Sequence, residues 1–84
     1  MTTDKDGKIG LPREFGGRIS IRLGEIGMSQ RTLAQILKVS EGTISRWIGG
    51  TRVPSTARLF GLASVLGVTT DWLVGLKDER GEGP

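Results

Sequence analysis

The sequence predicts an all-α fold, a compact bundle of about five short helices. Three observations predict it. Apolar residues recur at spacings of three and four between residues 14 and 77, as they do on one face of a helix. A serine, threonine or proline precedes most of these stretches, and a glycine follows most of them, as is typical of helix ends. No stretch alternates apolar and polar residues for long enough to predict a strand.

The first two predicted helices lie on either side of Gly27. The first helix ends at that glycine and presents one apolar face, formed by Phe15, Ile19, Leu23 and Ile26. The second helix spans Gln30–Leu37 and follows Ser29, whose hydroxyl can accept from the first free backbone N–H groups. We expect three of its residues to face inward, Leu33, Ala34 and Leu37.

Three further helices follow in the same manner. The third spans residues 41–48; Ser40 caps it and two glycines end it. We expect its inward-facing residues to be Ile44, Trp47 and Ile48. The fourth opens after Pro54 and Ser55, and its apolar residues before Gly67 are Leu59, Phe60, Leu62, Ala63 and Leu66. A short fifth helix, capped by Thr69 or Thr70, contains Trp72, Leu73 and Leu76.

The helices define one expected domain at residues 14–77. Residues 1–13 mix charge, glycine and proline without periodicity, so we expect a flexible N-terminal arm. Residues 78–84 are expected to form a flexible tail or the stub of a linker, and their composition suits a natural chain end equally well.

Glycine is unusually frequent, at 14 of 84 residues. Nine of these glycines lie in the two arms or at predicted helix ends. The other five lie at or inside helices, where each lowers stability by about 0.5–1 kcal/mol relative to alanine; they are Gly16, Gly17, Gly24, Gly42 and Gly61. Because so short a chain also buries only a modest core, we expect marginal stability.

The composition excludes several classes of function. The chain has no cysteine and no histidine, which removes disulfides, zinc sites and the usual nucleophilic triads. The remaining carboxylates of the central segment are scattered, and the glycines form no phosphate-binding P-loop. We therefore expect no enzyme, no metal, no cofactor and no small-molecule ligand. No apolar run could cross a membrane and the polar start lacks a signal peptide, so the expected location is cytoplasmic.

Positive charge is concentrated in the middle of the chain. The net charge is +3, but residues 15–77 alone carry eight basic and three acidic residues, a net +5. A polyanionic partner would be attracted there, although a solvated basic surface has the same composition.

The stretch from Gln30 to Gly50 carries the functional signal. Two short helices joined by three residues must cross steeply, and a small residue, Ala34, stands where the backbones would approach. The third helix then presents an outward face of short, polar or basic residues, namely Glu41, Gly42, Ser45 and Arg46. Such a helix fits the major groove of DNA, where arginine reads guanine and glutamate accepts from cytosine.

The order and spacing of residues 15–77 resemble the Cro/repressor-type (XRE-like) helix-turn-helix family, most of all the DNA-binding domains of temperate-phage repressors. The resemblance rests on two stretches, MSQRTLAQILKVSEGTISRWIGGTRVP and LFGLASVLGVTTDWLVG. It implies a lambda-repressor-like DNA-binding fold. It also implies a sequence-specific regulator of transcription, a phage-type repressor that binds a near-palindromic double-stranded operator as a homodimer, inside the bacterial cell and at its nucleoid.

The resemblance also assigns roles to residues. Those implied to read bases are Ser40, Glu41, Gly42, Ser45 and Arg46. Those implied to contact phosphates are Gln30, Arg31, Thr43, Thr51 and Arg52. Gln30 is further expected to brace Glu41, and the C-terminal helices are expected to pair two subunits.

Three residues depart from the family pattern. Lys38 replaces a glycine often found at the turn, so a left-handed backbone there would cost about 1 kcal/mol. Arg22 falls where an apolar residue is usual, and Gly42 puts no side chain at a base-facing position.

Simpler interpretations stay open for several residues. Arg46 is by default a solvated charge, Glu41 is already favourable at a helix start through the helix dipole, and Gln30 suits any exposed helix. We expect solvated or diffusely acting side chains at Arg18, Arg22 and Arg58. A dimer seam or simple partial exposure would each explain the apolar residues Val65, Trp72 and Val74. The alternative function is a protein-interaction module on the same fold, antitoxin-like or an anti-repressor partner.

Overall fold

The computed structural model describes residues 2–3, 9–10 and 14–77. Its five helices are α1 (Glu14–Ile26), α2 (Gln30–Leu37), α3 (Glu41–Gly49), α4 (Thr56–Leu66) and α5 (Thr70–Leu73). They confirm the predicted all-α bundle and its helix boundaries closely. The expectations of a flexible arm at 1–13 and a flexible tail at 78–84 fall almost entirely outside the described residues.

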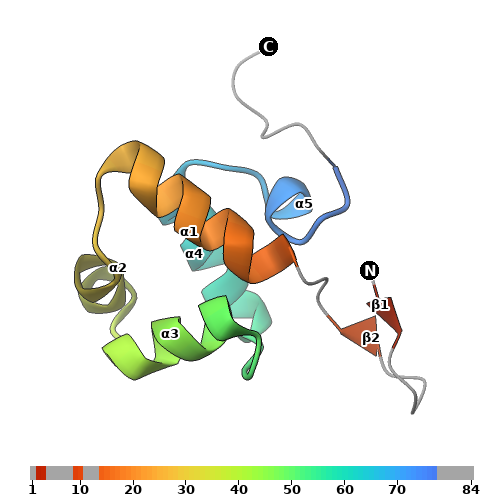
Figure 1. The fold of residues 1–84 in the computed structure, drawn as a ribbon, viewed down its shortest axis with the longest axis horizontal. Coiled ribbons are helices and arrows are strands. Elements are labelled where there is room, and N and C mark those ends of the chain that lie inside the picture. The colour runs from red at the N-terminus through yellow and green to blue at the C-terminus, as the bar shows by residue number, and fades with distance from the viewer. Residues whose placement is uncertain (1, 4–8, 11–13, 78–84) are drawn as a thin grey trace.

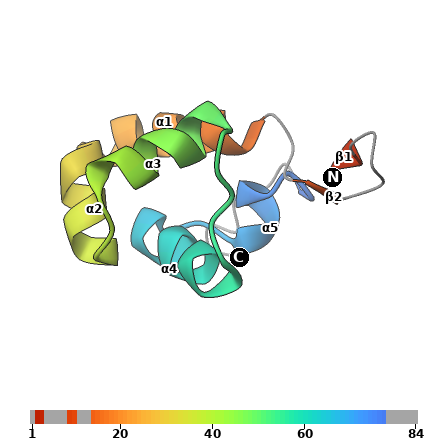
Figure 2. The ribbon, with the colours of Figure 1, turned by 90° about the horizontal axis from the view of Figure 1, so that it is seen from below.

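The helices form two layers (Figures 1 and 2). In Figure 2, α1 and α3 lie side by side in one layer, α4 and α5 lie in the other, and α2 closes one end between them. Each helix contributes at least one fully buried side chain to the core between the layers, and these are Ile19, Leu33, Ile44, Leu62, Leu66 and Leu73. Trp47 and Trp72 are buried in the same cluster.

Four of the five helices begin with the same local device. A serine or threonine side chain accepts a hydrogen bond from the backbone N–H three residues later, at Ser29, Ser40, Ser55 and Thr69. This bond satisfies one of the donors that a helix start leaves free. The sequence signal was sufficient here because the donor and acceptor are near neighbours in the chain.

Three apolar residues predicted to belong to the helix faces lie outside the core. Phe60 is 59% exposed because the buried side of α4 is centred on Leu62, Ala63 and Leu66, and Phe60 projects away from it. Ile26 is the last residue of α1 and is exposed where the chain turns away. Leu76 follows the end of α5, which is shorter than predicted, and is 57% exposed.

The residues considered for a dimer seam are mostly interior. Trp72 and Val74 are buried within this chain, and Val65 packs half-buried against the core. Both earlier explanations, partial exposure and a seam, are therefore wrong for Trp72 and Val74.

The structure also contains two short strands that the sequence did not predict. Strands β1 (Thr2–Thr3) and β2 (Ile9–Gly10) pair antiparallel, with Thr2 opposite Gly10 and Thr3 opposite Ile9. Two residues are too few to show an alternating pattern, which is why periodicity could not reveal them.

Candidate nucleic-acid interface

The centre of the candidate site is the steep corner between α2 and α3. Lys38, Val39 and Ser40 join the two helices. The backbone N–H of Lys38 bonds to the carbonyls of Ala34 and Gln35, and the N–H of Val39 lies 3.0 Å from the Ala34 carbonyl oxygen. These bonds end α2. Ser40 Oγ then accepts from the Thr43 N–H at 3.0 Å and starts α3.

Lys38 supplies the change of direction at this corner. Its backbone is left-handed, with φ 58° and ψ 43°, and it is the non-glycine residue with positive φ among those described. The left-handed backbone whose cost was considered for Lys38 is therefore present. The strain, about 1 kcal/mol, is tolerated because bonds on both sides fix the turn.

The inner side of α3 is held against α1 at very short range. Ile44 and Trp47 are buried in the core. A Cβ atom added to Gly16 would lie 1.9 Å from the carbonyl oxygen of Ile48, so the backbones of α1 and α3 touch at this point. Because one side of α3 is fixed in this way, the opposite side is presented outward.

That outward side carries the residues predicted to read bases. Ser40, Glu41, Gly42, Ser45 and Arg46 are all exposed. Glu41, Gly42, Ser45 and Arg46 follow the helical spacing of one face. The Ser40 hydroxyl also lies 2.8 Å from Thr43 Oγ1, so part of its bonding capacity is used within the turn. A Cβ at Gly42 would have only ordinary contacts, the nearest at 3.8 Å, with Arg46 Nη1 and Ser40 Oγ.

The residues predicted to contact phosphate lie at the start of α2, on α3 and in the loop after α3. Arg31, Thr51 and Arg52 are exposed, and Gln30 and Thr43 are half-buried. The backbone N–H groups of Thr51 and Arg52 reach the Arg46 carbonyl oxygen at 3.0 and 3.3 Å, so the following loop is folded against the end of α3. The expected bond between Gln30 and Glu41 is not formed among the described residues.

Basic side chains divide into two groups. In the first group, Arg18 Nη1 donates to the carbonyl of Trp72 and, at 3.0 Å, to that of Lys77. Its guanidinium also stacks 5.0 Å from the centre of the Trp72 ring. Arg58 donates to the Leu37 carbonyl, and Lys77 lies 3.6 Å from Asp71.

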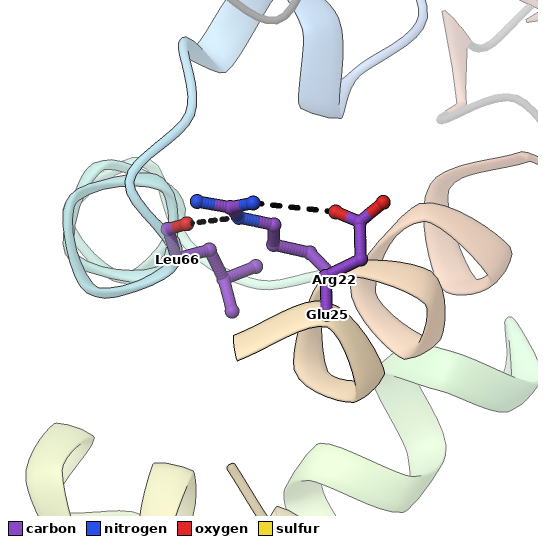
Figure 3. Close-up of polar contacts among 3 residues, drawn as sticks. All are labelled: Arg22, Glu25 and Leu66. Carbon is purple, nitrogen blue, oxygen red and sulfur yellow. Dashed lines mark hydrogen bonds and ion pairs between the residues drawn. The ribbon is translucent and has the colours of Figure 1, made fainter. Parts of the chain in front are cut away.

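Arg22 belongs to the same group (Figure 3). Its Nε donates to the Leu66 carbonyl at 2.7 Å and its Nη1 pairs with Glu25 at 3.2 Å, which joins α1 to the end of α4. The expectation of solvated or diffusely acting side chains is therefore wrong for Arg18 and Arg22, which are half-buried and hydrogen-bonded, whereas Arg58 is exposed as expected and also binds a carbonyl. Each binds carbonyls at or just beyond the end of another helix, which sequence could not reveal because the partners lie 21 to 59 residues away.

The second group consists of exposed side chains on the helix-turn-helix segment and the loop that follows it. Among the described residues, no hydrogen bond or ion pair holds the side chains of Arg31, Lys38, Arg46 and Arg52. All four are exposed, and they lie on α2, the turn, α3 and the loop after it. The basic residues of the helical domain therefore divide into four exposed side chains without a bond to the described residues and four that are hydrogen-bonded or ion-paired within the domain.

Comparison with known proteins agrees with this geometry. A helix-turn-helix family model matches residues 19–73. The chain belongs to the helix-turn-helix family, of the Cro/repressor type. It is 35% identical over 71 residues to a 26 kDa repressor protein of Escherichia phage HK022, covering 80% of this chain and 30% of that protein. It is 35% identical over 60 residues to the transcriptional regulator DicA of Escherichia coli, covering 71% of this chain and 44% of that protein.

Solved structures show the same helix-turn-helix fold. The DNA-binding domain of the P22 C2 repressor superposes with a TM-score of 0.70 at 26% identity, covering all of this chain and 96% of that one. The N-terminal DNA-binding domain of SinR from Bacillus subtilis superposes with a TM-score of 0.69 at 28% identity, covering 84% of this chain and all of that one. By contrast, the chain spans less than half the length of the phage HK022 repressor protein and of DicA.

Arg22, which stands where an apolar residue was expected, is half-buried, and its Nε binds the Leu66 carbonyl. No cluster of metal-ligating side chains is present in the part of the chain that the structure describes. Nor does any helix in that part combine the length and apolarity needed to cross a bilayer.

Proposed function

We propose that this domain is the sequence-specific DNA-binding part of a transcriptional repressor. One observation carries the proposal: among the described residues, the four basic side chains without an internal partner lie on α2, the turn, α3 and the loop after it, whereas the other basic side chains of the helical domain are hydrogen-bonded or ion-paired. A polyanion is the partner that such a distribution suits. The similarity to a phage repressor and to two DNA-binding domains supports the same function.

The proposed mechanism separates positioning from reading. Gln30, Arg31, Thr43, Thr51 and Arg52 bind backbone phosphates and set the orientation of α3 in the major groove. Arg46 then binds a guanine through its two parallel donors, while Ser40, Glu41 and Ser45 test neighbouring base edges. Gly42 leaves the helix backbone free to approach the groove.

The active form is proposed to be a homodimer on a near-palindromic operator. A single module buries only about 600–1,000 Å² on DNA, so pairing raises affinity to a useful level. Two recognition helices would then enter successive major grooves about 34 Å apart. Blocking a promoter by occupancy needs no chemical step, and we accordingly propose neither an enzymatic role nor a cofactor for this cytoplasmic regulator.

Selection of bound sequences from a random duplex pool tests the proposal. We expect a recovered motif with two related half-sites. With that duplex, Arg46→Ala should relax preference at one base pair per half-site and cost about 1–3 kcal/mol. Arg52→Ala should weaken binding to all sequences alike and lower the salt slope by about one. An unchanged sequence preference in Arg46→Ala at fixed salt would remove Arg46 as the reading residue.

A titration with random duplex at 50 and 200 mM salt separates the two candidate functions. A DNA-binding domain should bind at the lower concentration and lose affinity steeply at the higher one. Absence of binding at both concentrations would contradict the proposal and favour the protein-interaction module.

A further inference from the structure

One of the occupied arginines reaches the helix-turn-helix corner from outside it. Arg58 lies in the first turn of α4, and its Nη1 donates to the carbonyl of Leu37, the last residue of α2. The next residue, Lys38, is the left-handed residue that turns the chain toward α3. The bond therefore lies directly beside the point where the path of the chain changes direction.

We propose that Arg58 is a positioning residue for DNA binding. By holding the end of α2, it sets the direction in which the turn presents α3. The inference rests on the proposed function, because its consequence is measured on DNA. It assigns Arg58 no contact with DNA.

The chemistry of the two groups suits this role. The last carbonyls of a helix lack partners within the helix and carry the negative end of its dipole. The carbonyls of Ala34 and Gln35 are satisfied by the N–H groups of Lys38 and Val39, whereas that of Leu37 takes the guanidinium. A permanently charged donor at this end stabilises it more strongly than a neutral donor would.

A groove borders the bond. An open groove of about 340 Å³ lies here, lined by Leu37, Ser55, Ala57, Arg58 and Gly61. Across the described residues, the Arg58 bond is the polar link between α2 and α4. Arg58 is itself anchored, since its backbone N–H donates to Ser55 Oγ at 3.3 Å. The side chain thus crosses the groove from a fixed base.

Arg58→Gln and Arg52→Gln form a matched test, because each removes one positive charge. The probe is the duplex recovered by the selection described above, and affinity is measured well below the melting temperature over a series of salt concentrations. For Arg58→Gln we expect Kd to rise about fivefold, equivalent to about 1 kcal/mol, with an unchanged salt slope. For Arg52→Gln we expect the slope to fall by about one.

Two results would overturn the inference. A fall of the salt slope in Arg58→Gln equal to that in Arg52→Gln would mean that Arg58 binds phosphate. An unchanged Kd with a lowered melting temperature would mean that Arg58 serves stability alone.

A measurement without DNA keeps the inference separate from the proposed function. In Arg58→Gln, amide hydrogen exchange should accelerate at Lys38 and Val39, whose N–H groups bond to the end of α2, and stay unchanged at Thr51 beyond α3. If the wild-type domain selected no duplex, the proposed function would be contradicted. Unchanged amide hydrogen exchange at Lys38 and Val39 in Arg58→Gln would contradict the positioning role, whether or not the domain binds DNA.

Discussion

Gly16 and Gly17 are neighbours in α1, but their surroundings differ completely. A Cβ at Gly16 would lie 1.9 Å from the carbonyl oxygen of Ile48 and 2.7 Å from its carbonyl carbon. These are backbone atoms, which cannot rotate aside. A Cβ at Gly17 would have no atom within 4 Å.

We therefore expect opposite effects from the same substitution at the two positions. Gly16→Ala should force α1 and α3 apart and lower the free energy of unfolding by about 1–3 kcal/mol. Gly17→Ala should raise it by about 0.5–1 kcal/mol, because alanine favours the helix. Urea denaturation of the two variants and the wild type measures both changes. Equal effects at the two positions would contradict the close approach of α1 and α3.

Sequence could identify these glycines but not distinguish them. Both were predicted to weaken a helix by a similar amount, since propensity depends on the residue and its own helix. The difference comes from Ile48, 32 positions from Gly16, and depends on how two helices cross. Lys38 is the contrary case: its left-handed backbone was predictable, because the requirement arises within the turn itself.

At the scale of elements, the caps of α3 and α5 provide a test that separates folding from binding. Ser40 and Thr69 each accept from the backbone N–H three residues later, at 3.0 and 3.1 Å. Both are exposed. Only Ser40 lies on the face proposed to meet DNA. Aspartate caps a helix about as well as serine, so it can replace either residue while adding a negative charge.

Ser40→Asp and Thr69→Asp should both leave the melting temperature nearly unchanged, because the cap is kept and a negative charge is favourable at a helix start. Ser40→Asp should weaken DNA binding about tenfold at low salt, since its carboxylate would face phosphates. Thr69→Asp should bind within about twofold of the wild type. Thermal denaturation and fluorescence anisotropy measure the two properties. Equal loss of binding in both variants would argue against α3 as the DNA-facing element.

Caps and helix extents were predictable because they depend on residues within one turn. The predicted burial of Phe60 was wrong. Helical spacing identifies the apolar face of a helix, but it does not show how much of that face the neighbouring helices cover. Phe60 fits the spacing of α4 and still projects from the edge of the buried side. The candidate face of α3 was predictable for the same local reason as the caps, once the family pattern located the turn.

At the scale of the whole molecule, net charge is a poor guide to binding strength. The central segment carries +5 by sequence. Arg18, Arg22 and Arg58 nevertheless bind carbonyls inside the domain, while Arg31, Lys38, Arg46 and Arg52 have no internal partner among the described residues. The second group should therefore determine how DNA affinity depends on salt.

Replacing two basic residues that have no internal partner among the described residues should change the salt dependence of DNA binding. Replacing an arginine that binds carbonyls within the domain should not. The double substitution Arg31→Gln with Arg52→Gln should reduce the slope of log K against log salt by about two, since each phosphate contact contributes about 0.9. Arg18→Gln should leave the slope unchanged and lower the free energy of unfolding by about 1–2 kcal/mol, because it removes charged hydrogen bonds. A slope that falls in Arg18→Gln would contradict the division of the cations.

The arginine bonds to helix ends also bear on how this fold can change in evolution. In each of them the acceptor is a backbone carbonyl, at Leu37, Leu66 or Trp72. Every amino acid supplies a carbonyl, so the acceptor position can be substituted freely as far as this bond is concerned, whereas the arginine cannot. Paired substitutions across these contacts are therefore not expected. Methods that infer spatial proximity from correlated changes in related sequences would miss the contacts that tie α4 to α2 and α1.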